Sequence, residues 1–139
     1  MYRVYNIEKK KWIKDNIFLA PNGDLYVLKK SLFGRQKIVP ISDEDYVIHK
    51  DIELYDKNGD VIYESDYVKA SVAEDRTVIG LVTYAYELAA YIILCMGSGE
   101  YFTLGQDVCE FIKVIGNVFD GYDEEEQNGQ QSLQESEVQ

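Results

Sequence analysis

His49 is the only imidazole in this 139-residue chain and the first residue to test for acid–base chemistry. Asp51 and Glu53 follow it at spacings of two and four, so in a strand the three side chains share one face. Carboxylates close to the ring would favour its protonated form. Strand neighbours two apart are still roughly 6 to 7 Å from each other. We therefore expect a solvated strand face here and no catalytic pair.

Cys95 and Cys109 are the two thiols, and each has apolar neighbours such as Leu94, Met96 and Val108. Burial among such residues raises the pKa of a thiol and leaves less of the nucleophilic thiolate. We expect two reduced core cysteines, with no disulfide and no catalytic cysteine.

The loop DKNGD at 56–60 places oxygen-bearing side chains around Gly59, as calcium loops do. An EF-hand loop needs twelve residues, ends in a bidentate Glu and lies between helices, whereas this loop lies between two expected strands. The acidic runs at 43–45 and 124–126 are typical of solvated surface. The sequence predicts neither a metal site nor a cofactor.

Lys9, Lys10, Lys11 and Trp12 combine cations with an aromatic ring, which is the chemistry that contacts single-stranded nucleic acid. The same residues also suit the soluble turn of a hairpin. The chain has 25 acidic and 14 basic residues and a formal net charge of -11, which opposes binding to a phosphate backbone. Nucleic-acid binding through these four residues is therefore the alternative function.

The composition, 46% apolar and 28% charged, predicts a folded globular chain. No basic segment followed by an apolar stretch opens the sequence, and the most apolar stretch, 81–96, contains Thr83 and Glu87 and is too short to span a bilayer. We expect a cytoplasmic protein that does not bind membranes.

Two Asn-Gly pairs, Asn22-Gly23 and Asn58-Gly59, stand between short apolar runs and predict β-hairpins. Gly59 is expected to adopt positive φ in a type I′ or related turn. Residues 46–54 alternate with a period of two, which predicts a half-buried strand. Its apolar face would carry Tyr46, Ile48, Ile52 and Leu54, and its polar face His49, Asp51 and Glu53.

Residues 79–94 fit either a buried helix or two buried strands. Their β-branched and aromatic residues favour two strands joined by a turn at 87–90, and a helix over 88–96 is the alternative. Residues 120–139 contain seven acidic residues and no basic ones, which predicts a disordered acidic tail.

Several sequence blocks resemble the YopX-like proteins of phages and prophages: DKNGDVIYESDYVK at 56–69, GLVTY at 80–84, VIGNVF at 114–119, YRV at 2–4 and NGDLY at 22–26. The family usually has Gly where this chain has Ser65, a position at which Gly enters positive φ at low cost. The resemblance implies a small, mostly β protein encoded on phage or prophage DNA, and it carries over no catalytic residues.

We therefore predict a mainly β fold in three parts. Residues 1–45 form an N-terminal β meander packed on a small SH3-like β-barrel at 46–119, with one short helix at most, and residues 120–139 form the disordered tail. We expect a non-enzymatic protein-interaction module that associates with itself or with a phage or host protein, because aromatic β surface is abundant.

Overall fold

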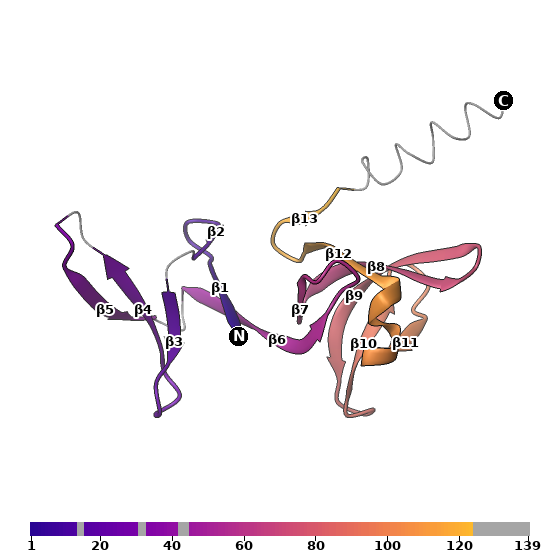
Figure 1. The fold of residues 1–139 in the computed structure, drawn as a ribbon, viewed down its shortest axis with the longest axis horizontal. Coiled ribbons are helices and arrows are strands. Elements are labelled where there is room, and N and C mark those ends of the chain that lie inside the picture. Colours follow the sequence, from indigo (N-terminus) through magenta and orange to yellow (C-terminus); the bar gives the residue numbers. More distant parts are fainter. Residues whose placement is uncertain (14–15, 31–32, 42–44, 124–139) are drawn as a thin grey trace. The chain divides into compact units, whose positions relative to one another are not determined.

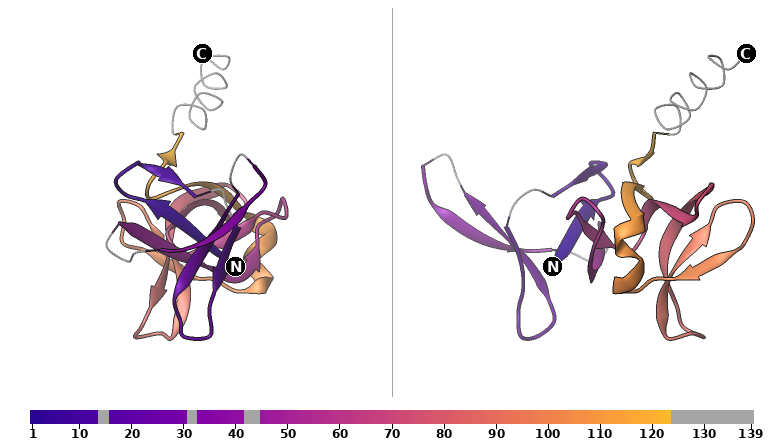
Figure 2. Two further views of the ribbon diagram at one scale, coloured as in Figure 1. Left: turned by 90° about the vertical axis from the view of Figure 1, so that its left-hand side faces the viewer. Right: turned by 45° about the vertical axis from the view of Figure 1, so that its right-hand side comes forward.

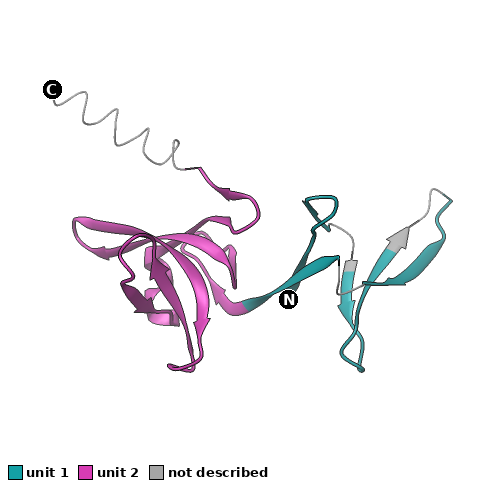
Figure 3. Cartoon of the chain, turned by 180° about the vertical axis from the view of Figure 1, so that it is seen from behind, with its two compact units in different colours: residues 1–51 teal, residues 52–139 magenta. Residues whose placement is uncertain are grey.

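The computed structural model describes residues 1–13, 16–30, 33–41 and 45–123. The chain divides into two compact units, unit 1 at Met1–Asp51 and unit 2 at Ile52–Gln139 (Figures 1 and 3). In chain order the elements are β1 (Tyr2–Asn6), β2 (Lys11–Trp12), β3 (Asn16–Leu19), β4 (Leu25–Lys30), β5 (Gln36–Pro40), β6 (Tyr46–Tyr55), β7 (Val61–Tyr63), β8 (Asp66–Ala73), β9 (Arg76–Ala85), β10 (Ala90–Cys95), β11 (Tyr101–Thr103), the 3-10 helix η1 (Gln106–Phe111), β12 (Ile112–Asn117) and β13 (Gly121–Tyr122).

Unit 1 contains the antiparallel sheet β3-β4-β5 and the antiparallel strands β2, β1 and the first half of β6. A small core of apolar side chains lies between these two layers. It consists of Val4, Leu25, Val27 and Ile41, with Ile13, Ile17, Val39 and Tyr46 packed against it. Leu25 and Val27 are alternate residues of β4, so this core uses one face of that strand.

The two Asn-Gly hairpins are confirmed, and both use the same turn. At the first, the Gly23 N–H donates to the Ala20 carbonyl and the Ala20 N–H to the Asp24 carbonyl. At the second, Gly59 and Asp56 repeat this pattern with Asp60. Only the glycine has positive φ in each turn, 89° at Gly23 and 82° at Gly59. A type I′ turn needs positive φ at both central residues, so these are instead three-residue loops ending in a left-handed glycine.

Substituting Gly59 by valine should lower the free energy of unfolding by roughly 1 to 3 kcal/mol, because a β-branched residue is strained at positive φ. A Cβ at Gly59 would meet no atom within 4 Å, so the loss comes from the backbone alone. Urea denaturation measures it, with Asp60→Asn as a control expected to change little. An unchanged midpoint for Gly59→Val would contradict the turn assignment.

Unit 2 is built on the six-stranded antiparallel sheet β11-β10-β9-β8-β12-β13. The sheet curls into a half-barrel, and η1 precedes its strand β12 (Figures 1 and 2). Its core consists of Ile52, Ile62, Val68, Ala70, Val82, Ile93, Leu104 and Ile112. Gly80 allows close packing here, because a Cβ at this position would clash with Cγ2 of Ile93.

The mainly β fold class is confirmed, and residues 79–85 and 90–94 lie in strands β9 and β10. The turn between these strands covers residues 86–89, and the alternative helix over 88–96 is wrong. The strand pairing establishes this arrangement, since Ala85 pairs with Ala90 and Gly80 with Cys95 across the two strands. One short helical segment is present in the described residues, η1, and it lies later in the chain.

Two sequence-based boundaries differ from the structure. The unit boundary falls after Asp51 and not after residue 45, because residues Tyr46 to Lys50 of β6 pair with β1. Within the segment expected as a tail, Gly121 and Tyr122 form β13 and pair with β12. The Tyr122 ring contacts Tyr67 at 4.9 Å between centroids, which anchors this strand. The rest of the expected tail, 124–139, lies outside the described residues.

Ser65 occupies the turn between β7 and β8 with a φ of 71°. Its N–H donates to the Val82 carbonyl at 2.8 Å, and its carbonyl accepts from the Val118 N–H at 3.1 Å. The position resembling a family glycine therefore does adopt a left-handed conformation, and its backbone bonds hold a serine there.

Replacing Ser65 with glycine should raise the free energy of unfolding by about 0.5 to 1 kcal/mol. Glycine relieves the left-handed strain of a side chain, and its extra freedom in the unfolded chain offsets part of this gain. Thermal and urea denaturation measure the change, and Ser65→Ala serves as the control that keeps the strain. A lower stability for Ser65→Gly than for Ser65→Ala would contradict this account.

Candidate functional site

His49 lies in a cluster of side chains on the face of β1 and β6 that carries Arg3 and Tyr5. It is only 6% exposed, although the sequence placed it on a solvated face, and that expectation is wrong. Pairing of Arg3 with His49 and of Tyr5 with Trp12 across the strands brings the four side chains together. Arg3 Nε donates to His49 Nδ1 at 3.2 Å, and the Arg3 guanidinium lies 4.7 Å from the centroid of the Trp12 ring.

The His49 ring packs 5.8 Å from the Trp12 ring between centroids. Burial, and secondarily the charge of Arg3, lower the pKa of His49 from 6.5 to about 4. The accepting Nδ1 requires a neutral ring with its proton on Nε2. Asp51 binds the N-terminal ammonium at 3.1 Å, and Glu53 is exposed with a φ of 64°.

Because folding lowers the pKa of His49, protonation of this residue at acid pH should destabilise the folded state. The unfolded chain binds the proton below about pH 6.5, whereas the folded chain resists it until about pH 4. The contribution of neutral His49 to the free energy of unfolding is therefore fully present above pH 6.5. It falls by on the order of 1 to 3 kcal/mol as the pH is lowered towards 4. Urea denaturation across this range should show a shallower pH dependence for His49→Gln than for the wild type, and equal slopes would contradict the account.

Lys9, Lys10 and Lys11 lie at the β1–β2 turn and are exposed. Lys10 has a φ of 54°, and the Lys9 N–H donates to Asn6 Oδ1 at 3.0 Å. Trp12 is half-buried, with its ring against Tyr5 and Arg3. The three lysines, consecutive in the sequence, are therefore exposed, whereas the tryptophan ring belongs to the packed cluster.

Cys95 is buried, Cys109 is half-buried, and both are reduced. Burial raises the pKa of each thiol, with smaller contributions from Glu100 at Cys95 and from Asp107 at Cys109. This environment disfavours the thiolate, as expected from the sequence.

In the loop at 56–60, Asp56 orders the backbone. Its Oδ1 accepts from the N–H groups of Asn58 and Asp60 at 2.9 and 2.8 Å, and its Oδ2 accepts from the Val114 N–H at 2.9 Å. These bonds use the carboxylate that a calcium loop would offer to an ion. Within the described residues there is no group of three or more His, Cys, Asp or Glu that could hold a metal.

The outer face of the sheet β3-β4-β5 is an apolar surface that the sequence analysis did not single out. Strand register places Phe18, Tyr26 and Pro40 side by side, and Leu28 beside Ile38. Phe18 stacks on Tyr26 at 5.7 Å, yet Phe18 is 40% exposed and Ile38 is 58% exposed. These five residues are here called the outer face. Its two members on β4, Tyr26 and Leu28, alternate with the buried Leu25 and Val27. Both faces of β4 are therefore apolar, although only one packs within unit 1.

The hairpin β4–β5 ends in a basic and aromatic tip. Phe33 is 93% exposed, next to Gly34 with a φ of 78°, and Arg35 and Lys37 beside it are exposed. Residues 25–41 contain four basic residues and no acidic one. We call Phe33 and Arg35 the hairpin tip.

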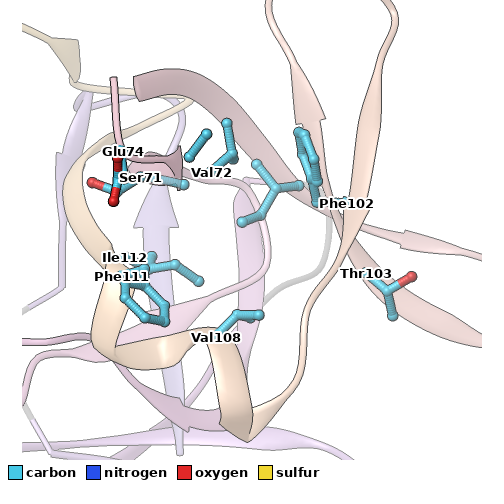
Figure 4. Close-up of a pocket in the computed structure, with 11 residues that line it drawn as sticks. Ser71, Val72, Glu74, Phe102, Thr103, Val108, Phe111 and Ile112 are labelled. Atoms are coloured by element: carbon cyan, nitrogen blue, oxygen red, sulfur yellow. The ribbon is translucent and has the colours of Figure 1, made fainter. Parts of the chain in front are cut away.

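Unit 2 contains an apolar cavity of about 590 Å³, formed by β8, β10, β11, η1 and β12 (Figure 4). Phe102 lies on one side, and Phe111 and Ile112 lie on the other. The polar side chains of its lining are Ser71, Glu74 and Thr103, and no lining residue is basic. Asp107 and Glu110 are exposed on η1, next to the lining residues Val108 and Phe111. The volume lies in the range of ligand sites, which are about 300 to 1,000 Å³.

Charge divides sharply between the two units. Residues 1–51 contain ten basic and seven acidic residues, a net of +3, whereas residues 52–139 contain four basic and eighteen acidic residues, a net of -14. The sequence analysis considered only the charge of the whole chain and the acidic residues at 120–139, and so missed this contrast. Five of the eighteen acidic residues lie at 124–139, outside the described residues.

A family model described as YopX protein matches residues 1–122. The crystal structure of the protein yopX from Bacillus subtilis is similar, with a TM-score of 0.55 and 19% identity over 85% of this chain and 91% of that one. The crystal structure of the protein EF1440 from Enterococcus faecalis is matched with a TM-score of 0.48 and 21% identity over 85% and 92% of the two chains. No curated protein matches the chain. No helix among the described residues is long and apolar enough to cross a membrane.

Proposed function

This chain belongs to the YopX protein family, and we propose that it is a protein-interaction module of phage or prophage origin that associates with itself in the cytoplasm. The observation that carries the proposal is the outer face of the sheet β3-β4-β5. An antiparallel sheet with one solvated face normally alternates apolar and polar residues, whereas β4 carries Leu25, Tyr26, Val27 and Leu28 in succession. A sheet that is apolar on both faces is suited to packing on both sides.

The partner proposed for this surface is a second copy of the chain. The charges of +3 on unit 1 and -14 on unit 2 favour contact between unlike units of two molecules. None of the five residues of the outer face, Phe18, Tyr26, Leu28, Ile38 and Pro40, carries a charge, so burying these side chains desolvates no ion among them. A phage or host protein with an apolar, acid-rimmed surface would be the alternative partner.

We propose a non-enzymatic role because the groups capable of catalysis are engaged elsewhere. His49 accepts a hydrogen bond from Arg3 and is buried, and both thiols have raised pKa values. The Asp56 carboxylate is bonded to three backbone N–H groups. These contacts support the proposal that the candidate residues stabilise the fold.

Light scattering coupled to gel filtration tests self-association directly on the full chain. We expect a mass above 16.0 kDa that rises with concentration through the high micromolar range. A monomer mass throughout, with no protein recovered in a pull-down, would contradict the proposal.

Nucleic-acid binding through the β1–β2 turn is the second candidate, favoured by the three adjacent exposed lysines in the basic unit 1. An electrophoretic mobility shift at low salt tests it, because added salt can only weaken such binding. A shift that is lost in the combined variant Lys9→Gln, Lys10→Gln, Lys11→Gln would support this candidate. No shift at low salt would exclude an electrostatic mode.

A further inference from the structure

We propose that the hairpin tip of one molecule inserts Phe33 into the apolar cavity of unit 2 of a second molecule. The inference rests on the self-association proposed above and names the receptor surface for it. It begins from two features that match: a nearly fully exposed aromatic side chain and an apolar cavity.

The first step is shape and polarity. Phe33 is 93% exposed at the end of a two-stranded projection, so it can enter a recess that a flat sheet face cannot. The cavity of about 590 Å³ has room for an aromatic ring and presents Phe102 and Phe111 to it (Figure 4). Aromatic side chains in well-packed, desolvated pockets supply much of the affinity of protein interfaces.

The second step is charge. Arg35 lies two residues from Phe33, and the hairpin 25–41 has four basic residues and no acidic one. Glu74 lines the cavity, and Asp75, Asp107 and Glu110 lie next to lining residues in the sequence. A cation beside the inserted ring would therefore meet carboxylates at the cavity, which favours orientation and rate of encounter. Association through these charges should weaken as salt is added.

The third step is symmetry. The tip and the cavity lie on different units, so the contact joins unlike surfaces. Two molecules can exchange it reciprocally about a two-fold axis, or molecules can repeat it head to tail in closed rings or open filaments. In either case each contact needs one tip and one cavity, which separates the inference from a contact of like surfaces.

The experiment is sedimentation velocity on the full chain with two complementary variants. Phe33→Ser removes the ring from the tip, and Ala73→Trp fills the cavity from an exposed lining position. We expect each variant alone to associate about tenfold or more weakly than the wild type. An equimolar mixture should restore a 1:1 dimer and no larger species, because one intact tip then meets one intact cavity. Tyr86→Ser is the matched control, since Tyr86 is 88% exposed and does not line this cavity.

Charge reversal provides a second pair at exposed positions, so the test does not depend on Ala73→Trp folding. Arg35→Glu and Glu74→Arg should each weaken association, and their mixture should restore it. The inference would be overturned if Phe33→Ser associated as strongly as the wild type, or if the mixtures stayed monomeric. Neither result would contradict self-association itself. A monomeric wild type would overturn both proposals.

Discussion

Replacing Asp56 with alanine is expected to lower the free energy of unfolding by roughly 3 to 5 kcal/mol. The carboxylate is buried and accepts hydrogen bonds from the N–H groups of Asn58, Asp60 and Val114. The last of these bonds connects the β6–β7 turn to β12, 58 residues later in the chain. Alanine would leave three donors without their acceptor at the edge of the unit 2 core, which is among the costly classes of mutation.

Urea denaturation of Asp56→Ala measures this loss. The matched control is Asp60→Ala in the same turn, because Asp60 is exposed and takes part in the hairpin through its backbone. We expect less than about 1 kcal/mol of loss for this control, as for most surface substitutions. Similar losses for the two variants would show that the carboxylate bonds do not hold the turn to β12.

Replacing Ile38 with lysine is expected to weaken self-association by about tenfold or more while leaving the monomer folded. Ile38 is exposed in β5 and lies beside Leu28 on the outer face, so a lysine there is solvated in the monomer. In the associated state its ammonium would be buried against apolar side chains, at a large cost. Sedimentation equilibrium gives the dissociation constant of each variant.

Leu94→Lys is the matched control for this substitution. Leu94 is also an exposed aliphatic residue of a strand, but it lies on β10 of unit 2, outside the outer face and the cavity lining. We expect wild-type association from it. Equal weakening by Ile38→Lys and Leu94→Lys would point to a general effect of added positive charge and against the outer face.

Local signals in the sequence were sufficient for the hairpins and the strands. Asn22-Gly23 and Asn58-Gly59 act within a few residues, and the alternation in 46–54 indicated the strand β6. That alternation put Ile48 on the apolar face, but Ile48 is 36% exposed, so this part of the prediction is wrong. The same alternation could not reveal that His49 is buried. Its burial comes from Arg3 and Trp12, which reach it only after β1 pairs with β6 and β2 with β1.

The cavity and the unit boundary were beyond the sequence for a related reason. The cavity lining comes from five elements between Ala70 and Ile112, and each contributes apolar residues that look like ordinary core. The boundary falls inside one continuous strand, β6, which pairs with β1 before Asp51 and packs Ile52 into the other core. The outer face did leave a signal, since four successive apolar residues in β4 require both faces to be covered.

Photo-crosslinking from position 38 tests the central claim, self-association through the outer face, most directly. The full chain would carry benzoylphenylalanine in place of Ile38, with Lys50 replaced in the same way as a control, since Lys50 is exposed in unit 1 on the strand β6. We predict that irradiation produces covalent dimers of this chain from position 38 and far fewer from position 50. Equal yields from the two positions, or no dimer from position 38 at concentrations where the mass exceeds that of a monomer, would contradict the account.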